Sequence, residues 1–300
     1  MKLSRAAVRE LVVEPGKAAR LGRRSTQTTD CDWLGPLGRT HPKEVAEHDL
    51  DLFKADLMAA QSLLYAADRW SLLLVFQALD AGGKDGTIKH VMSGVDPQGC
   101  EVVSFKEPSE LEVRHDFLWR CAIQLPERGR IGIFNRSYYE DVLVVRVHPE
   151  LAARRPSGAA AGDAMWRERF EDINAFEHHL ARNGTRVVKF FLHVSEAEQR
   201  RRLLERLDDP DKRWKFSPSD LAEHGRFDEY QTAYEEAITA TSTAWAPWYV
   251  VPADHKYALR ALVGGIVVHE IDSLDLSHPE PDAAQRQMIE EATEALRAEQ

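Results

Sequence analysis

The hydrophobic pattern divides the chain into short apolar runs and longer stretches with helical spacing. Residues 71–79 (SLLLVFQAL) are a continuous apolar run of strand length, the kind buried on both faces of a parallel sheet. Further short apolar runs predict strands at 101–105, 130–135, 186–194 and 248–251. Apolar side chains recur at helical spacing over 41–69, 109–125, 163–182, 195–207, 227–245 and 255–270.

Five strands that alternate with helices predict an α/β fold with a doubly wound sheet, because parallel strands need crossover connections and these are helical here. We expect a three-layer sandwich with a central five-stranded parallel sheet. The chain is interpreted as one domain over 1–300, with an extended N-terminal arm over 1–40, a lid over about 196–225 and a C-terminal helix over 279–300. In such sheets ligands bind at the carboxyl ends of the strands.

Composition narrows the class of function. The formal net charge of -10 argues against a nucleic-acid or membrane partner, so an anionic ligand needs a local cluster of basic residues. The three cysteines are far apart and show neither disulfide nor zinc spacing. With no long apolar stretch and no secretory pattern at the N-terminus, the expected location is cytoplasmic.

The sequence ALDAGGKDGTIKHV at 78–91 lies between a predicted strand and a predicted helix, the context of a phosphate-binding loop. Lys84 stands where the motif G-x-x-x-x-G-K-[ST] has its lysine, but Ala78 replaces the first glycine and Asp85 replaces the hydroxyl residue. Asp80 is the best candidate for a magnesium ligand, and Asp85 is the second. The alternatives are a tight turn with solvated charges and, for Asp80, a helix cap.

A second cluster of polar residues follows the predicted strand 130–135. Asn135 ends the strand, Arg136 comes next, and Glu140 and Asp141 follow. An arginine at this edge can contact phosphoryl oxygens in a bidentate manner and neutralise charge during transfer. The alternative is an ion pair of Arg136 with one of the two carboxylates.

A run of basic residues over 200–215 is the local positive cluster that an anionic ligand would need. Arg202 and Arg206 are four residues apart and would share one helix face, and the polar stretch beyond them could close over a site as a lid. The alternative is an ordinary solvated helix face. The sequence carries neither G-x-S-x-G nor H-E-x-x-H. Phosphoryl transfer to an existing phosphate would explain this, because the accepting oxygen is already ionised.

Read together, the loop, FNRSYYEDVLVVRVHPEL, FKEPS with HDFLWR, and RLDDPDKRWKFSPSDL resemble the type-2 polyphosphate kinases. The similarity extends from VEPGK near residue 13 to APWYVVPADHKYALR near Arg260. In that family a P-loop core with a helical lid moves phosphoryl groups between inorganic polyphosphate and nucleotides, with magnesium. Its loop has the form D-x-x-G-K-[DG]-G-T, which is matched by Asp80, Gly83, Lys84, Asp85, Gly86 and Thr87.

The resemblance implies a role for each of these positions. Lys84 and Arg136 would contact the transferred phosphate, while Arg202 and Arg206 would bind phosphates from the lid. Mg²⁺, or Mn²⁺ in its place, would be held by Asp80, with Asp85 and Asp141 as further ligands. Residues implied to line a polyphosphate channel, or alternatively to form surface ion pairs, are Lys89, Lys106 and Arg120.

The resemblance also bears on acceptors and assembly. The version of the motif with Asn135 and Glu140 resembles the subgroup that accepts both AMP and ADP. Many members have aspartate in place of Asn135, so a second carboxylate ligand is in question there. A homodimer or homotetramer is expected. Two other functions remain open: an ATP-dependent nucleoside-monophosphate kinase, and a non-catalytic nucleotide-binding scaffold, motivated by Ala78 and Asn135.

Overall fold

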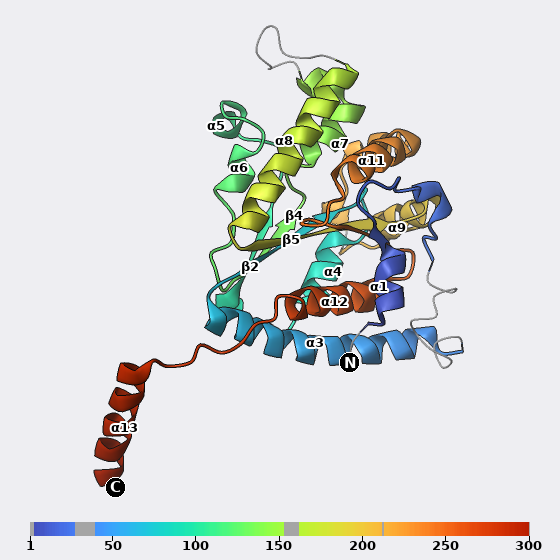
Figure 1. The fold of residues 1–300 in the computed structure, drawn as a ribbon. Helices are drawn as coiled ribbons and strands as arrows, with labels where there is room; N and C mark the ends of the chain where they lie inside the picture. Colours follow the sequence, from blue (N-terminus) through green and yellow to red (C-terminus); the bar gives the residue numbers. More distant parts are fainter. Residues whose placement is uncertain (1–2, 28–39, 153–161, 212, 300) are drawn as a thin grey trace.

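The structure is a computed structural model, and it describes residues 3–27, 40–152, 162–211 and 213–299 (Figure 1). Its strands are β1 (Val12–Val13), β2 (Ser71–Gln77), β3 (Cys100–Ser104), β4 (Ile131–Asn135), β5 (Thr185–His193) and β6 (Trp248–Pro252). Its α-helices are α1 (Arg5–Leu11), α3 (Pro42–Ala67), α4 (Lys84–Val91), α5 (Glu110–Val113), α6 (Trp119–Ala122), α7 (Glu140–Val147), α8 (Asp163–Arg182), α9 (Glu196–Asp208), α10 (Pro218–His224), α11 (Phe227–Thr241), α12 (Lys256–Asp272) and α13 (Ala283–Ala298). Short 3-10 helices are η1 (Leu21–Arg23), η3 (Pro97–Gly99), η4 (Pro149–Ala152) and η5 (Arg213–Lys215).

The strands form one sheet in the order β1-β6-β5-β2-β4-β3. The five strands that the apolar runs predict are present, and they pair in parallel. The sheet has one strand more than predicted, because β1 pairs antiparallel with β6 through Val12 and Val13. Two residues are too few to show an alternation of polar and apolar side chains, so the sequence pattern could not reveal this strand.

Two hydrophobic cores lie on opposite faces of the sheet. Alternate side chains of β2 enter different cores: Leu72 and Leu74 enter the first, whereas Leu73 and Val75 enter the second. Helices α3, α4 and α12 cover the first face, and α7, α8 and α11 cover the second (Figure 1). This arrangement is the predicted three-layer sandwich.

The loops that follow β2 and β4 meet at one edge of the sheet. β2 and β4 are parallel neighbours, with Phe76 opposite Asn135. After β2 the chain enters α4 on the first face, whereas after β4 it enters α7 on the second. Connections that leave on opposite faces open a crevice at the carboxyl ends of the strands, which is where ligands bind in open α/β sheets. The glycine-rich loop therefore lies at the crevice.

The single helix expected over 109–125 is wrong, since this segment forms two separate turns, α5 and α6. Ser109 caps α5, since its hydroxyl accepts a hydrogen bond from the Glu112 amide. The break has a local cause. The Asp116 carboxylate accepts hydrogen bonds from the amides of Leu118 and Trp119, which starts a new turn in place of continuing the first.

The predicted extended arm is instead folded onto the body, as far as residues 3–27 show; residues 28–39 lie outside the described part. Helix α1 buries Val8 and Leu11 in the first core. Ser242 donates from its hydroxyl to the Val13 carbonyl at 2.5 Å, which ties β1 to the end of α11. Seven-residue helices and two-residue strands show too little periodicity for sequence analysis to detect.

At the other end of the chain, α13 lies within the range predicted for a C-terminal helix and stands away from the body (Figure 1). Met288, Ile289 and Leu296 expose their apolar side chains on it. Among the described helices, none is both long and apolar enough to cross a lipid bilayer. Cys100 and Cys121 are free thiols, and Cys31 lies outside the described residues.

Candidate active site

The glycine-rich loop turns tightly between β2 and α4. Gly83 has a φ of 103°, a conformation that glycine adopts without the clash of a Cβ atom. A Cβ on Gly82 would lie 2.7 Å from the Ala78 Cβ and 2.8 Å from the Leu79 carbonyl oxygen. The methyl group of Ala78 therefore occupies the space that a side chain at position 82 would need. Because the loop leads directly into α4, the first amides of that helix are available to an anion held by the loop.

Lys84 is the first residue of α4 and is almost buried, with 9% of its surface exposed. Its Nζ donates to the carbonyl of Ala78 at 2.7 Å. Burial, and after it the charge of Arg136, lower the pKa of Lys84 to about 8. An ammonium has three donors, and the described residues satisfy one of them, so a phosphate in the loop would gain a strong, charge-assisted partner.

Arg136 lies beside the loop because the chain turns sharply at the end of β4. Its φ is 65°, in the left-handed region, and its amide donates to the carbonyl of Phe76 at 3.0 Å. The guanidinium contacts the carboxylates of Asp80 at 3.0 Å and Glu140 at 3.9 Å. A non-glycine residue held in a strained conformation is typical of a functional site. The fold thus brings Arg136 and Asp80 together from two adjacent strand ends.

The candidate metal ligands fall into two places. Asp80 and Asp85 both belong to the loop region, and Asn135 donates from Nδ2 to the Asp85 carboxylate at 2.7 Å. Asp141 instead lies 3.6 Å from Arg169, and burial raises its pKa. Within the described ranges, no three His, Cys, Asp or Glu side chains come together as a preformed metal site. Magnesium usually binds one or two carboxylates together with substrate phosphates, a donor set that Asp80 and Asp85 fit.

A cavity of about 250 Å³ opens beside Asp80 and Arg136. Its lining includes two tyrosines of α11, Tyr230 and the almost buried Tyr234. The other lining residues are Ala78, Leu79, Glu140, Leu143, Val144, Gln199, Ser219, Asp220 and Glu223. The cavity therefore combines aromatic and aliphatic walls with a charged end at the loop, an arrangement that suits a base and its phosphates.

The segment predicted as a lid forms another wall of this cavity. Gln199 of α9 donates from Nε2 to the carbonyl of Asp80 at 3.0 Å, and the His224 ring contacts the other end of the same amide at 2.7 Å. Arg206 pairs with Asp220 of α10 at 3.2 Å. Arg206 is thus held next to a residue that lines the cavity. Lys212, part of the same basic run, lies outside the described residues.

Arg202 is placed differently from Arg206. It is 4% exposed, and Nη1 donates to the carbonyls of Ala81 and Gly82, both at 3.1 Å. Nη2 donates to the carbonyls of Ala253 and Asp254, and Nε donates to Glu198. A guanidinium has five N–H donors, and here each has a protein acceptor. In this conformation Arg202 holds the loop in place and has no donor left for a phosphate.

Two basic residues that sequence reasoning did not single out flank the other side of the loop. Arg260 places Nη2 3.9 Å from the position of a Cβ on Gly86. Lys256 lies one turn earlier on α12, 3.9 Å from Glu205. Burial, and then the charge of Arg202, lower the pKa of Lys256. Their spacing of four residues, directly after a predicted strand, is the signal that could have revealed them.

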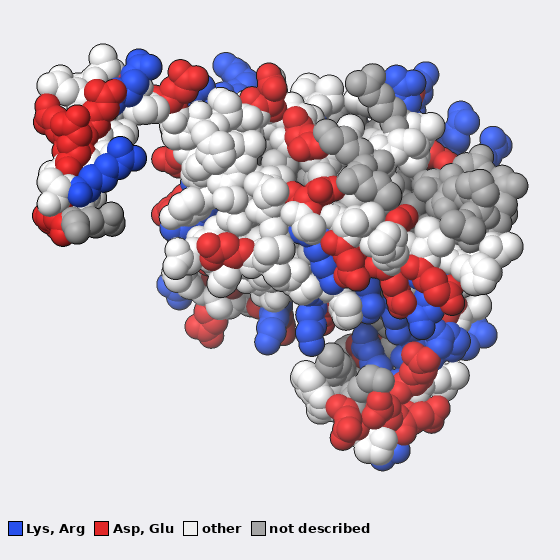
Figure 2. Space-filling model, turned by 90° about the horizontal axis from the view of Figure 1, so that it is seen from below, with Lys and Arg blue, Asp and Glu red and all other residues white. Residues whose placement is uncertain are grey.

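The space-filling view shows how unevenly charge is distributed on a chain with a net charge of -10. Basic side chains gather in the hollow between the main body and the smaller lobe at the bottom of Figure 2. Acidic side chains dominate the tip of that lobe. A local positive hollow on an acidic protein can concentrate an anionic ligand.

The three residues implied to line a polyphosphate channel have different environments. Lys89 is exposed on α4, one turn after Gly86. Lys106 is exposed just beyond the end of β3. Arg120 is buried, donates to the carbonyl of Lys106 at 2.9 Å and lies 5.4 Å from the centre of the Phe105 ring. Arg120 therefore supports the backbone near Lys106, while the two lysines present their side chains to solvent.

Comparison with known proteins gives a consistent result. A family model described as Polyphosphate kinase 2 (PPK2) matches residues 40–279. An ADP-polyphosphate phosphotransferase of Rhodopseudomonas palustris is 50% identical over 251 residues, which cover 82% of this chain and 87% of the relative. An AMP/ADP-polyphosphate phosphotransferase of Meiothermus ruber is 45% identical over 247 residues, covering 82% of this chain and 89% of the relative.

A solved structure agrees with these sequence relatives. The crystal structure of Polyphosphate Kinase 2 from Arthrobacter aurescens superposes with a TM-score of 0.84 at 36% identity, covering 97% of this chain and 98% of that one. This similarity of fold agrees with the α/β sandwich that the sequence predicts. The chain belongs to the polyphosphate kinase 2 family.

Proposed function

We propose that this enzyme transfers the terminal phosphoryl group of inorganic polyphosphate to ADP and also to AMP, with Mg²⁺, and runs in reverse when nucleoside triphosphate is in excess. Phosphoryl transfer between polyphosphate and nucleotides follows from membership of the family. The observation that supports the finer proposal is the convergence of Lys84, Arg136 and Asp80 on one loop. That loop has an aromatic-walled cavity on one side and cations on the other.

The two sides of the loop suit two different substrates. The cavity beside Asp80 and Arg136 is lined by Tyr230 and Tyr234, and the more exposed Tyr230 would pack against a nucleotide base or sugar. On the opposite side, a Cβ on Gly86 would meet the Arg260 guanidinium at 3.9 Å, and Lys256 lies one turn earlier on the same helix. Guanidinium groups favour a chain of phosphates over an uncharged base. This charge distribution supports polyphosphate, rather than ATP, as the donor.

Transfer in this site depends on charge neutralisation and alignment. The accepting oxygen of ADP or AMP is already ionised, so no side chain has to remove a proton from it. Lys84 would bind the phosphoryl group in transfer, and Arg136 would reach it from the end of β4 in place of its present contact with Asp80. Both cations stabilise charge that spreads over the phosphoryl oxygens as the bond to the donor breaks. Gln199 would help by keeping Asp80 in position.

The divalent ion belongs with the loop carboxylates. We propose Asp80 as its main protein ligand and Asp85 as the second, with Asn135 orienting Asp85 through its 2.7 Å hydrogen bond. When bound there, Mg²⁺ or Mn²⁺ supplies charge neutralisation for the phosphate oxygens. Asp141, paired with Arg169, is not proposed as a ligand. The hydrogen bond from Asn135 explains how the site keeps its order without the aspartate that many members have there.

ADP as an acceptor is supported by both relatives, since their names specify ADP. AMP is supported by the relative from Meiothermus ruber, which is named for both nucleotides. The purified chain, given polyphosphate as the only donor, should form ATP from ADP and ADP from AMP, measured by ion-exchange chromatography of the nucleotides. A chain that forms ATP from ADP but leaves AMP unchanged would restrict the acceptor to ADP.

The alternative donor is tested in the same assay. A nucleoside-monophosphate kinase would phosphorylate AMP with ATP and give no product with polyphosphate. A non-catalytic scaffold would bind nucleotide and turn over neither donor. The two departures that motivated the scaffold are accommodated here: Ala78 packs beside Gly82, and Asn135 pairs with Asp85.

The site assignment is tested by Lys84→Met and Arg136→Ala, with exposed Arg128→Ala as a matched control. Each of the first two should lower kcat by about 100-fold or more, the cost of removing one preorganised donor to a developing charge. The control should retain activity. Turnover of Lys84→Met and Arg136→Ala within a factor of about ten of wild type, or roughly 1.4 kcal/mol of barrier, would refute the assignment.

A further inference from the structure

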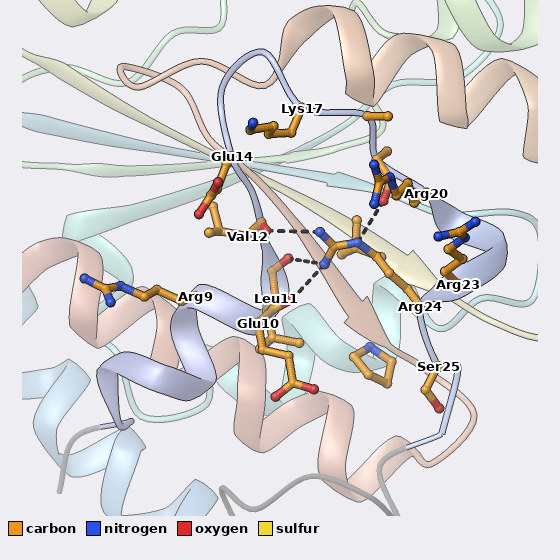
Figure 3. A pocket seen from close by; sticks show the side chains of 14 residues that line it. Arg9, Glu10, Leu11, Val12, Glu14, Lys17, Arg20, Arg23, Arg24 and Ser25 are labelled. Atoms are coloured by element: carbon orange, nitrogen blue, oxygen red, sulfur yellow. Dashed lines mark hydrogen bonds between the residues drawn. The ribbon is translucent and has the colours of Figure 1, made fainter.

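A second cavity, separate from the one beside the loop, lies between the N-terminal residues and strand β6. Its volume is about 700 Å³, and Figure 3 shows it from close by. Val250 and Pro252 form its floor. Its charged lining consists of Arg9, Lys17, Arg20, Arg23 and Arg24, with two carboxylates, Glu10 and Glu14. We call it the N-terminal hollow, and no part of the proposed reaction uses it.

The N-terminal hollow is firmly built. Arg24 donates to the carbonyls of Glu10 and Leu11 at the end of α1, to that of Val12 at the start of β1, and to that of Ala19 (Figure 3). One half-buried arginine thus joins both ends of the segment that encloses the hollow.

The opposite rim is held by helix α11. The Glu235 carboxylate accepts hydrogen bonds from the amides of Arg20 and Leu21, at 2.6 and 2.5 Å. Arg20 has a φ of 52°, which these bonds maintain. The same helix carries Tyr230 and Tyr234 into the cavity of the active site. The hollow is therefore a fixed part of the body.

Four cations of the hollow are available to a ligand. Arg9, Lys17, Arg20 and Arg23 are exposed, and their side chains make no hydrogen bond or ion pair with the part of the chain that the structure describes. Figure 3 shows Arg9 on one side of the hollow and Arg23 on the other, with Lys17 between them along the rim. Like charges held together without partners are stabilised by a bound anion.

The lining also indicates what kind of anion fits. Its uncharged residues are aliphatic or small, namely Leu11, Val12, Ala18, Ala19, Ser25, Val250 and Pro252, and none of the described lining residues is aromatic. A nucleotide or nucleic acid base would lack the stacking surface on which such ligands rely. Arginines favour phosphate oxygens. The chemistry therefore favours a linear chain of phosphates.

A short series of direct contacts connects the hollow to the glycine-rich loop. Next to Ser25 on the rim, Thr26 donates from its hydroxyl to the Asp254 carboxylate at 2.8 Å. The carbonyl of Asp254 accepts from Arg202 at 3.2 Å, and Arg202 donates in turn to Gly82 at 3.1 Å. Pro252, which ends β6, lines the N-terminal hollow, and the loop follows β2, so the two sites lie at the same edge of the sheet and are joined by these contacts.

We propose that the N-terminal hollow binds a distal part of the same inorganic polyphosphate chain whose end occupies the glycine-rich loop. The proposal rests on the proposed function for the identity of the ligand. A chain long enough to contact both sites is held twice, so its second contact forms at a high effective concentration. A short chain reaches the loop alone. The hollow therefore makes the enzyme selective for long polyphosphate.

The test neutralises the four available cations together: Arg9→Gln, Lys17→Gln, Arg20→Asn and Arg23→Gln. Asparagine is chosen at Arg20 because it tolerates the left-handed conformation. The matched control carries Arg128→Gln, Arg167→Gln, Arg286→Gln and Arg297→Gln, four exposed residues elsewhere with the same loss of charge. KM and kcat are measured for long-chain polyphosphate and for tripolyphosphate at low salt, with ADP saturating.

The hollow variant should raise KM for long-chain polyphosphate by about tenfold or more, with kcat and KM for tripolyphosphate unchanged. The control should match wild type for both donors. Equal KM changes for both donors, or the same change in the control, would overturn the proposal, because either result reflects general charge alone.

A binding measurement separates this proposal from the proposed function. Fluorescence anisotropy of end-labelled long-chain polyphosphate is recorded with the four substitutions added to Lys84→Met. If Lys84→Met alone still binds polyphosphate and the added substitutions abolish that binding, the result supports polyphosphate binding in the N-terminal hollow, even if no phosphoryl transfer is observed. Retention of that binding, or its displacement by orthophosphate as effectively as by polyphosphate, would overturn the proposal while leaving the active site untouched.

Discussion

Arg202 and Arg206 look alike in sequence, yet the structure predicts opposite consequences when each is replaced by glutamine. Arg202 is 4% exposed and donates to four backbone carbonyls, two in the glycine-rich loop and two in the segment that follows β6. Arg206 is 26% exposed and has Asp220 as its partner. Arg202 therefore holds the loop in place, whereas Arg206 makes a single ion pair next to the cavity, and we propose that it binds substrate.

The magnitude for Arg202→Gln follows from these contacts. Each buried carbonyl left without a donor costs about 1–3 kcal/mol, and such costs are not additive. Removing one partner from a buried, charged network typically costs about 3–5 kcal/mol. At about 2–4 °C per kcal/mol for a large domain, Tm should fall by roughly 10 °C. Because the loop loses its support, kcat should fall as well.

Arg206→Gln should behave as the loss of a partly exposed ion pair. Such pairs contribute about 0–1 kcal/mol, so Tm should change by no more than about 3 °C. KM for polyphosphate or nucleotide should rise because a cation next to the cavity is gone. Arg201→Gln is the matched control on the same helix, since its side chain is 53% exposed and pairs with Glu198 and Glu205.

The assays are differential scanning calorimetry of the three variants and steady-state kinetics with each substrate varied. The reasoning is refuted if Arg202→Gln keeps a Tm within about 2 °C of wild type and shows only a raised KM, the behaviour of a residue that binds phosphate from a lid. A fall in Tm for Arg206→Gln as large as that for Arg202→Gln would refute the distinction between them.

Three further predictions concern the site and the assembly. Because the pKa of Lys84 is lowered to about 8, its ammonium loses a proton as pH rises through that value, and kcat/KM for polyphosphate should decline between pH ~7 and ~9. Lys84→Arg should remove this decline, and a flat pH profile for the wild type would contradict the prediction. Asp80→Asn should raise the Mg²⁺ concentration that gives half-maximal rate by at least ~10-fold. Asp141→Asn should leave that concentration unchanged, because Asp141 contacts Arg169. A Mg²⁺ titration in which only Asp141→Asn raises it would reassign the ligand. A second copy of the chain should cover the apolar side of α13, since an isolated helix of this length is only marginally stable. Light scattering should show a dimer or tetramer, and the double variant Met288→Glu with Leu296→Glu should lower the fraction of that oligomer. A monomeric wild type would disprove the prediction.

The fold was largely predictable because its strongest signals are local. A run such as 71–79 is apolar and of strand length, which favours a buried strand, and β2 is fully buried. Alternation of such runs with helical periods allows few topologies other than a parallel sheet between two helical layers. The two elements that the sequence did not predict correctly, the helix over 109–125 and strand β1, also have local causes. The break at Asp116 depends on one carboxylate that captures two amides, and β1 is too short to show any period.

The sequence by itself also determined which residues surround the glycine-rich loop from adjacent strand ends. Lys84 and Asp80 belong to the loop that follows β2, and Arg136 follows β4. The carboxyl ends of parallel strands lie at one edge of the sheet, so the sequence could predict that these residues lie at the same edge. Spacing along a helix, however, says which residues share a face and not what that face meets. Arg202 and Arg206 lie on the same helix face, yet Arg202 is inserted among backbone carbonyls, whereas Arg206 pairs with Asp220, a residue that lines a cavity.

Only the tertiary structure decided the roles that depend on contacts between distant segments. Arg260 reaches Gly86 because α12 packs beside α4, and the N-terminal residues enclose a hollow because Glu235 of α11 binds their amides. Neither relation leaves a trace in local hydrophobic periodicity, which reports burial of apolar side chains along one element. The placement of charged and polar groups between elements is fixed by the packing of the whole sheet and its two layers, and it appears only once that packing is known.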